Sequence, residues 1–188
     1  MTAVISPLVS KAAFSIAQEK PLDIHAREAL LDRAMGPGRR RKSSEKLRRG
    51  RLPAEELAFA ARDAFGNLVG TVRLWNVVSG NGVAALLLGP LAVASQFKGA
   101  GIGSALMRHA IEEAARLEHG AVLLVGDAAY YGRFGFSAEK TGDLSMPGPF
   151  EKARFLGLEL KAGALDGAAG TLMAAGRKMQ AERGRAAA

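Results

Sequence analysis

The chain has 188 residues, the usual size of one domain, and its 48% hydrophobic and 23% charged residues are typical of a folded globular protein. It has no cysteine and only three scattered histidines, so we expect no disulfide, no thiol nucleophile and no metal site. The longest nearly apolar run, residues 83–94, is far shorter than the roughly 20 residues that span a bilayer. Because the N-terminus also lacks a signal-peptide pattern, we expect a cytoplasmic protein with no membrane partner.

The net charge of +8 is concentrated in two segments. Residues 39–51 hold eight lysines and arginines against one glutamate, and residues 177–185 hold four against one. Such segments attract anions, including nucleic acid, although a solvated charge run is the plainer interpretation. Residues 39–51 contain no aromatic side chain, so they lack the stacking surface that single-strand binders use.

The first half of the chain predicts one helix and a set of strands. A short strand is expected over 14–18, followed by a helix that Asp23 begins and that ends at Met35 before Gly36-Pro37. A basic linker with a short helix is expected over 37–52. Strand-like runs at 56–62, 68–78 and 83–94 are separated by turn residues that include Asn81-Gly82, a hairpin signal. We therefore expect three sequential antiparallel strands.

The second half changes in kind. Apolar residues at helical spacing predict a helix over 102–119, and the continuous apolar run 121–125 predicts a strand buried on both faces. Strand, glycine loop, helix and strand form a βαβ unit, whose two strands should be parallel. A short helix at 128–134, strands at 136–140 and 155–161, and a loosely ordered end from residue 162 complete the prediction. The expected class is α/β with a mixed sheet, in one domain over 1–188 with a flexible basic tail at about 177–188.

The most informative segment is QFKGAGIGS, residues 96–104, directly before the predicted helix. Its three alternating glycines remove side chains from the turn, so that successive N–H groups and the helix dipole can converge on a phosphate or diphosphate. A tight turn alone would also explain these glycines. No lysine stands where a P-loop needs one, and the antiparallel strands before the loop argue against a dinucleotide-binding fold.

Taken together, these segments resemble the GNAT N-acetyltransferase superfamily. Gln96, Gly99 and Gly101 match its Gln/Arg-x-x-Gly-x-Gly/Ala loop, flanked by the strand PLAV (90–93) and the segment YYGRFGF (130–136). The likeness is strongest over 86–136, extends to 160 and is only topological before residue 55. It implies the GNAT acyl-CoA N-acyltransferase fold, with an antiparallel meander and a splayed parallel strand pair that holds acetyl-CoA. It also implies direct acetyl transfer to a primary amine, on a small molecule or a protein, through a ternary complex.

The resemblance assigns roles to particular residues. Tyr131 corresponds to the tyrosine that serves as general acid, with a packed core aromatic as the alternative. Strand 84–94 contains no carboxylate, so Asp127 is our candidate for the base, with capping of the following helix as the alternative. Residues expected to contact the cofactor are Leu91, Ala92, Val93, Gln96, Lys98, Gly99, Ala100, Gly101, Ile102, Gly103, Ser104 and Tyr131.

Acceptor recognition is expected from three variable parts: the basic segment 39–51, Trp75 and the loop 147–149. A cationic rim that starts with Arg39, Arg40 and Arg41 would favour an anionic acceptor or lower the pKa of an approaching amine. Two other hypotheses are a nucleic-acid-binding protein that uses residues 39–51 and 177–185, and an acyl-CoA-binding module without turnover. We expect a monomer or a homodimer.

Overall fold

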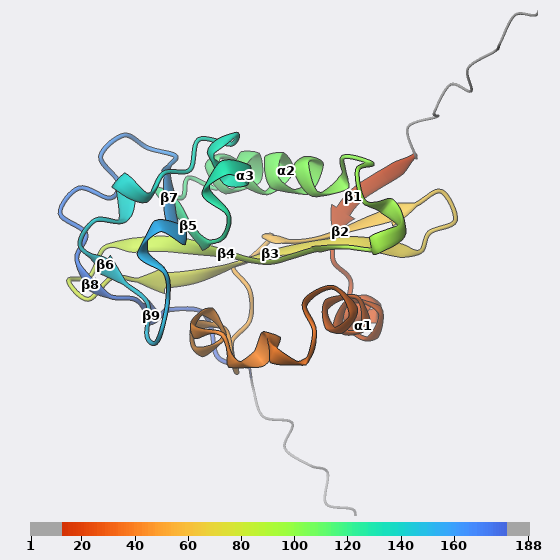
Figure 1. Ribbon diagram of the computed structural model, residues 1–188, viewed down its shortest axis with the longest axis horizontal. Coiled ribbons are helices and arrows are strands. Elements are labelled where there is room, and N and C mark those ends of the chain that lie inside the picture. Colours follow the sequence, from red (N-terminus) through yellow and green to blue (C-terminus); the bar gives the residue numbers. More distant parts are fainter. Residues whose placement is uncertain (1–12, 180–188) are drawn as a thin grey trace, which may run out of the picture.

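The computed structural model describes residues 13–179, and its centre is a seven-stranded mixed sheet (Figure 1). The strand order is β1-β2-β3-β4-β5-β7, with the short strand β9 paired to β3, while β6 and β8 form a separate pair. The strands are β1 (Phe14–Gln18), β2 (Ala58–Asp63), β3 (Leu68–Val78), β4 (Ala84–Val93), β5 (Ala121–Val125), β6 (Leu144–Ser145), β7 (Phe155–Glu159), β8 (Gly170–Thr171) and β9 (Met173–Ala174).

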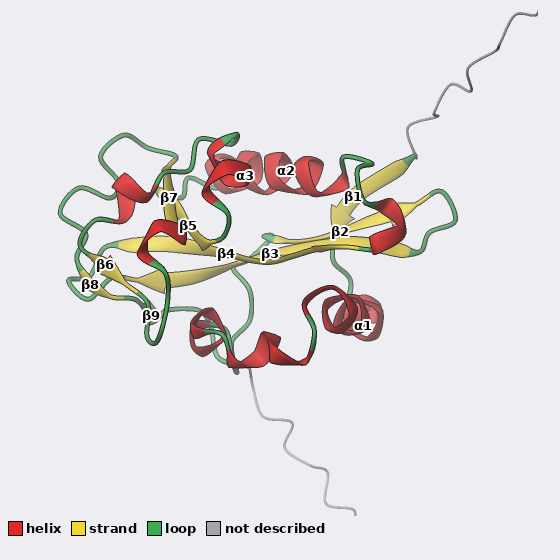
Figure 2. Cartoon of the chain, in the orientation of Figure 1, coloured by secondary structure: helices red, strands yellow, loops and turns green. Residues whose placement is uncertain are grey.

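Helices cover both faces of the sheet (Figure 2). One face carries α2 and α3, and the other carries α1 together with the basic segment that follows it (Figure 1). The helices are α1 (Ile24–Met35), α2 (Ile102–Arg116) and α3 (Ala128–Gly132), with 3₁₀ turns at Pro21–Asp23, Pro37–Arg41, Ser43–Leu47, Ser95–Phe97, Ala138–Thr141 and Lys152–Arg154. Within residues 13–179, no helix combines the length and apolarity needed to cross a bilayer.

The predicted meander and βαβ unit are confirmed. Strands β1 to β4 pair antiparallel in sequence order, and β4 pairs parallel with β5 after the helix α2 crosses over the sheet. Helix α2 turns one apolar face to the sheet, because its residues at spacings of three and four are buried. These are Ile102, Leu106, Met107, Ala110 and Ala114.

Two predictions about the second half are wrong. Residues 136–140 do not form a strand, because Ser137 caps a 3₁₀ turn at Ala138–Thr141 and makes only a single bridge to Gly157. The segment from 162 is not loose, since it buries Leu165 and Leu172 against the core. Of the tail expected at about 177–188, residues 177–179 pair with residues 50–52, and the remainder of that prediction lies outside the described residues.

The basic segment forms two 3₁₀ turns in place of a short helix, and ion pairs attach α1 and the first turn to the sheet. Glu19, whose side chain is 4% exposed, accepts hydrogen bonds from Arg27 of α1 and from Arg73 of β3. Arg39 of the first turn binds Glu28 of α1 at 2.6 Å. A chain of alternating charges therefore runs from the sheet through α1 to the basic segment.

We predict that Glu19→Gln lowers the free energy of unfolding by about 3 kcal/mol, because two largely buried guanidiniums lose a shared countercharge. Urea unfolding measures the change. The matched control is Glu56→Gln, whose ion pair with Arg116 is about half exposed on both sides and should contribute less than about 1 kcal/mol. Equal effects of the two substitutions would contradict the structural role of Glu19.

Candidate functional site

Strands β4 and β5 diverge in the middle of the sheet. They pair at only two positions, Leu86 with Val122 and Leu87 with Leu123, after which β4 continues to Val93. The register of β4 against β3 shifts by one residue where Gly89 and Pro90 lie opposite Arg73. Such a bulge bends the strand that carries the extra residue. The result is a cleft of about 100 Å³ between the two strands.

The second half of β4 has one unpaired edge. Ala94 donates its N–H to Val69 of β3, so Ala92, two residues earlier, also turns its backbone groups toward β3. The N–H and C=O groups of Leu91 and Val93 therefore lie on the opposite edge, where no strand of residues 13–179 pairs with them. From the sequence, residues 91–93 were all expected to contact the cofactor. In the structure, Leu91 and Val93 turn their backbone groups to the free edge of β4, whereas Ala92 turns its backbone groups to β3.

The glycine loop leaves a group of amides without partners at the start of α2. Lys98 and Ala100 donate their N–H groups within the loop, to Ser95 and Phe97. Gly99 and Gly101 both have a φ of +85°, which other residues adopt only at a cost. The described residues offer no hydrogen-bond acceptor to five amides: those of Gly99, Gly101, Ile102, Gly103 and Ser104. Five donors at a helix N-terminus suit a diphosphate. The side chains of Gln96 and Lys98 are exposed beside them.

Tyr131 lines the cleft between β4 and β5, together with Pro90, Leu91 and Val125. Its ring packs so closely on Gly126 that a Cβ there would lie 2.1 Å from the Cε2 atom of the ring. Burial raises the pKa of Tyr131 to about 12. The phenol is therefore protonated throughout the neutral pH range and can act as a proton donor.

Asp127 lies two residues after the end of β5 and caps α3. Its Oδ1 atom accepts the N–H of Tyr130 at 2.7 Å, and the side chain is exposed. Asp127 lines neither the cleft nor a second cavity, which lies on the α1 side of the sheet. Of the two roles expected from the sequence, the structure therefore displays the cap.

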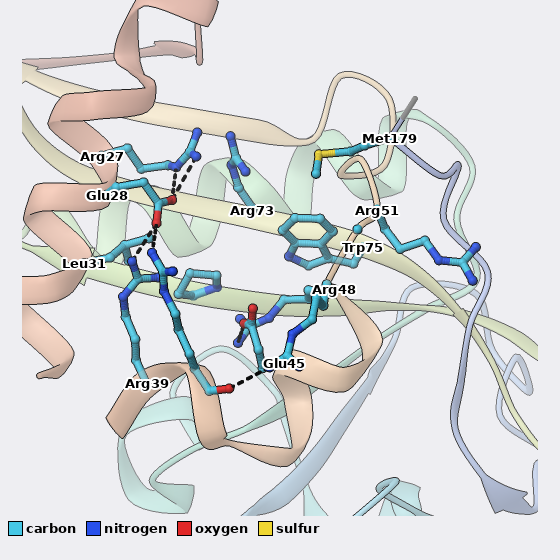
Figure 3. Close-up of a pocket in the computed structure, with 14 residues that line it drawn as sticks. Arg27, Glu28, Leu31, Arg39, Glu45, Arg48, Arg51, Arg73, Trp75 and Met179 are labelled. Atoms are coloured by element: carbon cyan, nitrogen blue, oxygen red, sulfur yellow. Dashed lines mark hydrogen bonds and ion pairs between the residues drawn. The ribbon is translucent and has the colours of Figure 1, made fainter. Parts of the chain in front are cut away.

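The second cavity, of about 380 Å³, lies on the α1 side of the sheet (Figure 3) and adjoins the cleft. The cleft and this cavity share Arg39, Arg48 and Pro90. Trp75 forms one wall, and its Nε1 donates to the carbonyl of Gly89 at 2.6 Å. The arginines that line it are Arg27, Arg39, Arg40, Arg48, Arg49, Arg51 and Arg73, against the acids Glu28 and Glu45. We call it the cationic cavity.

The charges in the cationic cavity are unevenly paired. Burial alone would raise the pKa of Glu28, but hydrogen bonds from Arg39 and Arg27 outweigh burial and hold that pKa below its ordinary value. Both carboxylates that pair with Arg39, those of Glu28 and Asp32, belong to α1. Arg41 lines neither the cationic cavity nor the cleft. Burial lowers the pKa of Arg48, an effect that Glu45 only partly offsets.

Sequence reasoning located part of this cavity. It named the basic segment and Trp75, which meet here, but missed Arg27 and Arg73, which come from α1 and β3. Nothing in the local pattern signals either residue. The loop 147–149 contacts the basic segment through a hydrogen bond from Ser43 to the carbonyl of Pro149, but lines a neighbouring hollow instead.

Comparisons with known proteins identify the family and the fold. Residues 54–138 match the family model of the acetyltransferase (GNAT) domain. The uncharacterized N-acetyltransferase YhbS of Escherichia coli K12 is 30% identical over 153 residues, which cover 81% of this chain and 90% of YhbS. The crystal structure of E. coli YhbS in complex with CoA aligns with a TM-score of 0.75 and 26% identity, over 92% of this chain and 93% of YhbS.

A GNAT acetyltransferase from Brucella melitensis, solved with acetyl-CoA, shares the fold. Its TM-score is 0.58 at 22% identity, over 79% of this chain and 88% of that one. The chain belongs to the GNAT family of N-acetyltransferases and is an acyltransferase.

We predict that Asp127→Asn leaves the turnover number within about threefold of the wild type, because asparagine caps helices as well as aspartate does. Steady-state release of free thiol from acetyl-CoA measures it. A loss of about a hundredfold or more would instead make Asp127 the general base, since that is the usual contribution of such a group.

Proposed function

Given that the chain is a GNAT acetyltransferase, we propose that it binds acetyl-CoA in the cleft between β4 and β5 and moves the acetyl group directly to a primary amine in a ternary complex. The observation that carries this proposal is the alignment of unpaired backbone groups. They run from the free edge of β4, beside Tyr131, to the five amides at the start of α2.

The residues present fit an acyl-CoA. Buried or partly buried backbone groups need hydrogen-bond partners, and an amide-bearing arm can supply them to Leu91 and Val93 as an added strand would. The amides of Gly99 and of 101–104 can hold a diphosphate, and the exposed ammonium of Lys98 adds a charge nearby. When bound, acetyl-CoA supplies an activated acetyl thioester.

Tyr131 Oη holds the proton for the leaving sulfur. The net change is one amide bond formed, one thioester bond broken and one proton passed from nitrogen to sulfur. Because the pKa of Tyr131 is raised to about 12, the phenol keeps its proton until a sulfur anion develops beside it.

The acceptor amine reaches the site without a protein carboxylate as its base. Among the described residues, the carboxylates that line the cationic cavity are Glu28 and Glu45, and both are paired with arginine. The surrounding arginines disfavour a second positive charge, so they lower the pKa of an amine that enters. The cavity itself therefore promotes the neutral, nucleophilic form.

Tyr131→Phe tests the proposal. We expect the turnover number to fall by about a hundredfold or more, because the general acid is lost, while the dissociation constant for acetyl-CoA stays within about threefold. Stopped assays of acetylated amine and calorimetric titration with acetyl-CoA measure the two quantities. Tyr130→Phe is the matched control. It removes the hydroxyl of the adjacent tyrosine but keeps its ring in contact with Tyr131, and it should retain activity.

The pH profile gives an independent check. An acid is active while protonated, so activity that depends on Tyr131 is lost only as the pH rises through about 12. The wild-type turnover number should therefore not decline between pH 7 and 10.

Unchanged turnover in Tyr131→Phe would contradict the role of general acid. The chain would then bind acyl-CoA with a tyrosine that takes no part in the transfer.

A further inference from the structure

The cationic cavity has the size of a small-molecule site. Its volume of about 380 Å³ falls within the range of metabolite-binding pockets. It lies on the α1 side of the sheet with Trp75 in its wall (Figure 3), and it shares Pro90 with the cleft that Tyr131 lines. A molecule bound here can therefore reach the proposed reaction centre from the side opposite α2.

Six of the seven arginines of this cavity fall into two groups. The first group makes hydrogen bonds to the carboxylates of Glu19, Glu28 or Asp32 and holds the fold together; its members are Arg27, Arg39, Arg40 and Arg73. Arg49 and Arg51 instead donate to the backbone carbonyls of Arg40 and Gly176. This second group adds positive charge to the wall without a carboxylate bound to it in residues 13–179.

Arg48 belongs to neither group, because it pairs with Glu45 and still keeps a donor without a partner. Its side chain is only 10% exposed, yet its Nε atom is buried with no hydrogen-bond partner among the described residues. Its Nη2 atom is 3.2 Å from Glu45 and from Ser44, and its Nη1 atom lies near the backbone of Gly89 at the bulge of β4. A buried N–H without a partner is costly, so this guanidinium is one for which an additional acceptor would be favourable.

We propose that the cationic cavity is the acceptor site and that Arg48 binds an oxyanion on the acceptor. The substrate class is then a small amine that also carries a carboxylate or a phosphate group. This inference rests on the proposed function, because it presumes that an amine is acetylated.

The chemistry of the residues supports this occupant. Guanidinium groups bind carboxylates and phosphates through paired, charge-assisted hydrogen bonds. The position of Arg48 at the junction of cavity and cleft sets the anion a short distance from the reaction centre, so the amine and the anion belong to one compact molecule. Arg39, expected from the sequence to face the acceptor, serves instead to hold the wall in place.

Anion binding to the CoA-saturated protein tests the site. Bound CoA places its own diphosphate on the loop amides, so inorganic phosphate or succinate added afterwards reports on the cationic cavity. Calorimetry should detect binding of one of them to the wild type, and Arg48→Gln should weaken that binding by about tenfold or more. The better probe distinguishes phosphate-bearing from carboxylate-bearing acceptors.

Matched variants keep the result interpretable. Arg41→Gln makes the same charge change in the same segment but outside the cavity, and should leave anion affinity within about twofold. Arg48→Lys keeps the charge but lacks the Nε donor and the planar fork, so it should still weaken binding. The same Arg48→Lys variant provides the test if Arg48→Gln does not fold. No anion binding by the wild type, or equal weakening by Arg41→Gln, would overturn the inference.

Acetylation of paired acceptors separates this inference from the proposed function. We expect kcat/KM to be at least about tenfold higher for O-phosphoethanolamine than for ethanolamine, or for β-alanine than for its amide, and the preference to vanish in Arg48→Gln. Acetylation without any such preference overturns the anion site and leaves the proposed function standing. Anion binding without acetylation of any amine supports the anion site and contradicts the proposed function.

Discussion

The site depends on one constraint in the sheet: β4 and β5 begin as a parallel pair and then separate. The extra residue of β4 at Gly89 and Pro90 bends that strand, and β5 ends at Val125 while β4 runs on to Val93. Backbone groups in a sheet interior would normally be paired, so the separation creates a row of unsatisfied donors and acceptors. The same divergence gives Tyr131 its place in the wall of the cleft.

The α1 side of the sheet contributes the cationic cavity, and electrostatic interactions hold its walls in place. Ion pairs centred on Glu19 and Glu28 hold α1 and the basic segment under the sheet, which encloses the cationic cavity. These pairs neutralise some arginines, whereas Arg48, which pairs with Glu45, keeps a buried Nε atom without a partner among the described residues. Arginines that hold the fold and the arginine proposed to bind the acceptor therefore lie side by side, and a count of local charges cannot distinguish them. An acyl donor entering along β4 and an acceptor entering from the α1 side would meet at Pro90 and Tyr131.

Local patterns predicted the fold well where structure is local. The glycine loop, the helix after it and the apolar run 121–125 specify the βαβ unit, and Asn81-Gly82 specifies the hairpin. Local patterns failed where tertiary packing determines the structure. The segment from residue 162 was expected to be loosely ordered, but burial of Leu165 and Leu172 orders it. The ion pair of Glu19 with Arg73 could not be predicted, because the two residues lie 54 positions apart in sequence. Gly89 stands inside a strand pattern, and a glycine in that position indicates a bulge of the kind that the structure has there.

A crystal structure of this protein with CoA tests the central claim most directly. We expect the diphosphate to accept hydrogen bonds from the amides of Gly99 and of residues 101–104, and the pantetheine amides to pair with Leu91 and Val93 along the free edge of β4. A coenzyme bound with its diphosphate away from these amides, or with β4 left unpaired, would contradict the claim that the divergence of β4 and β5 creates the binding site.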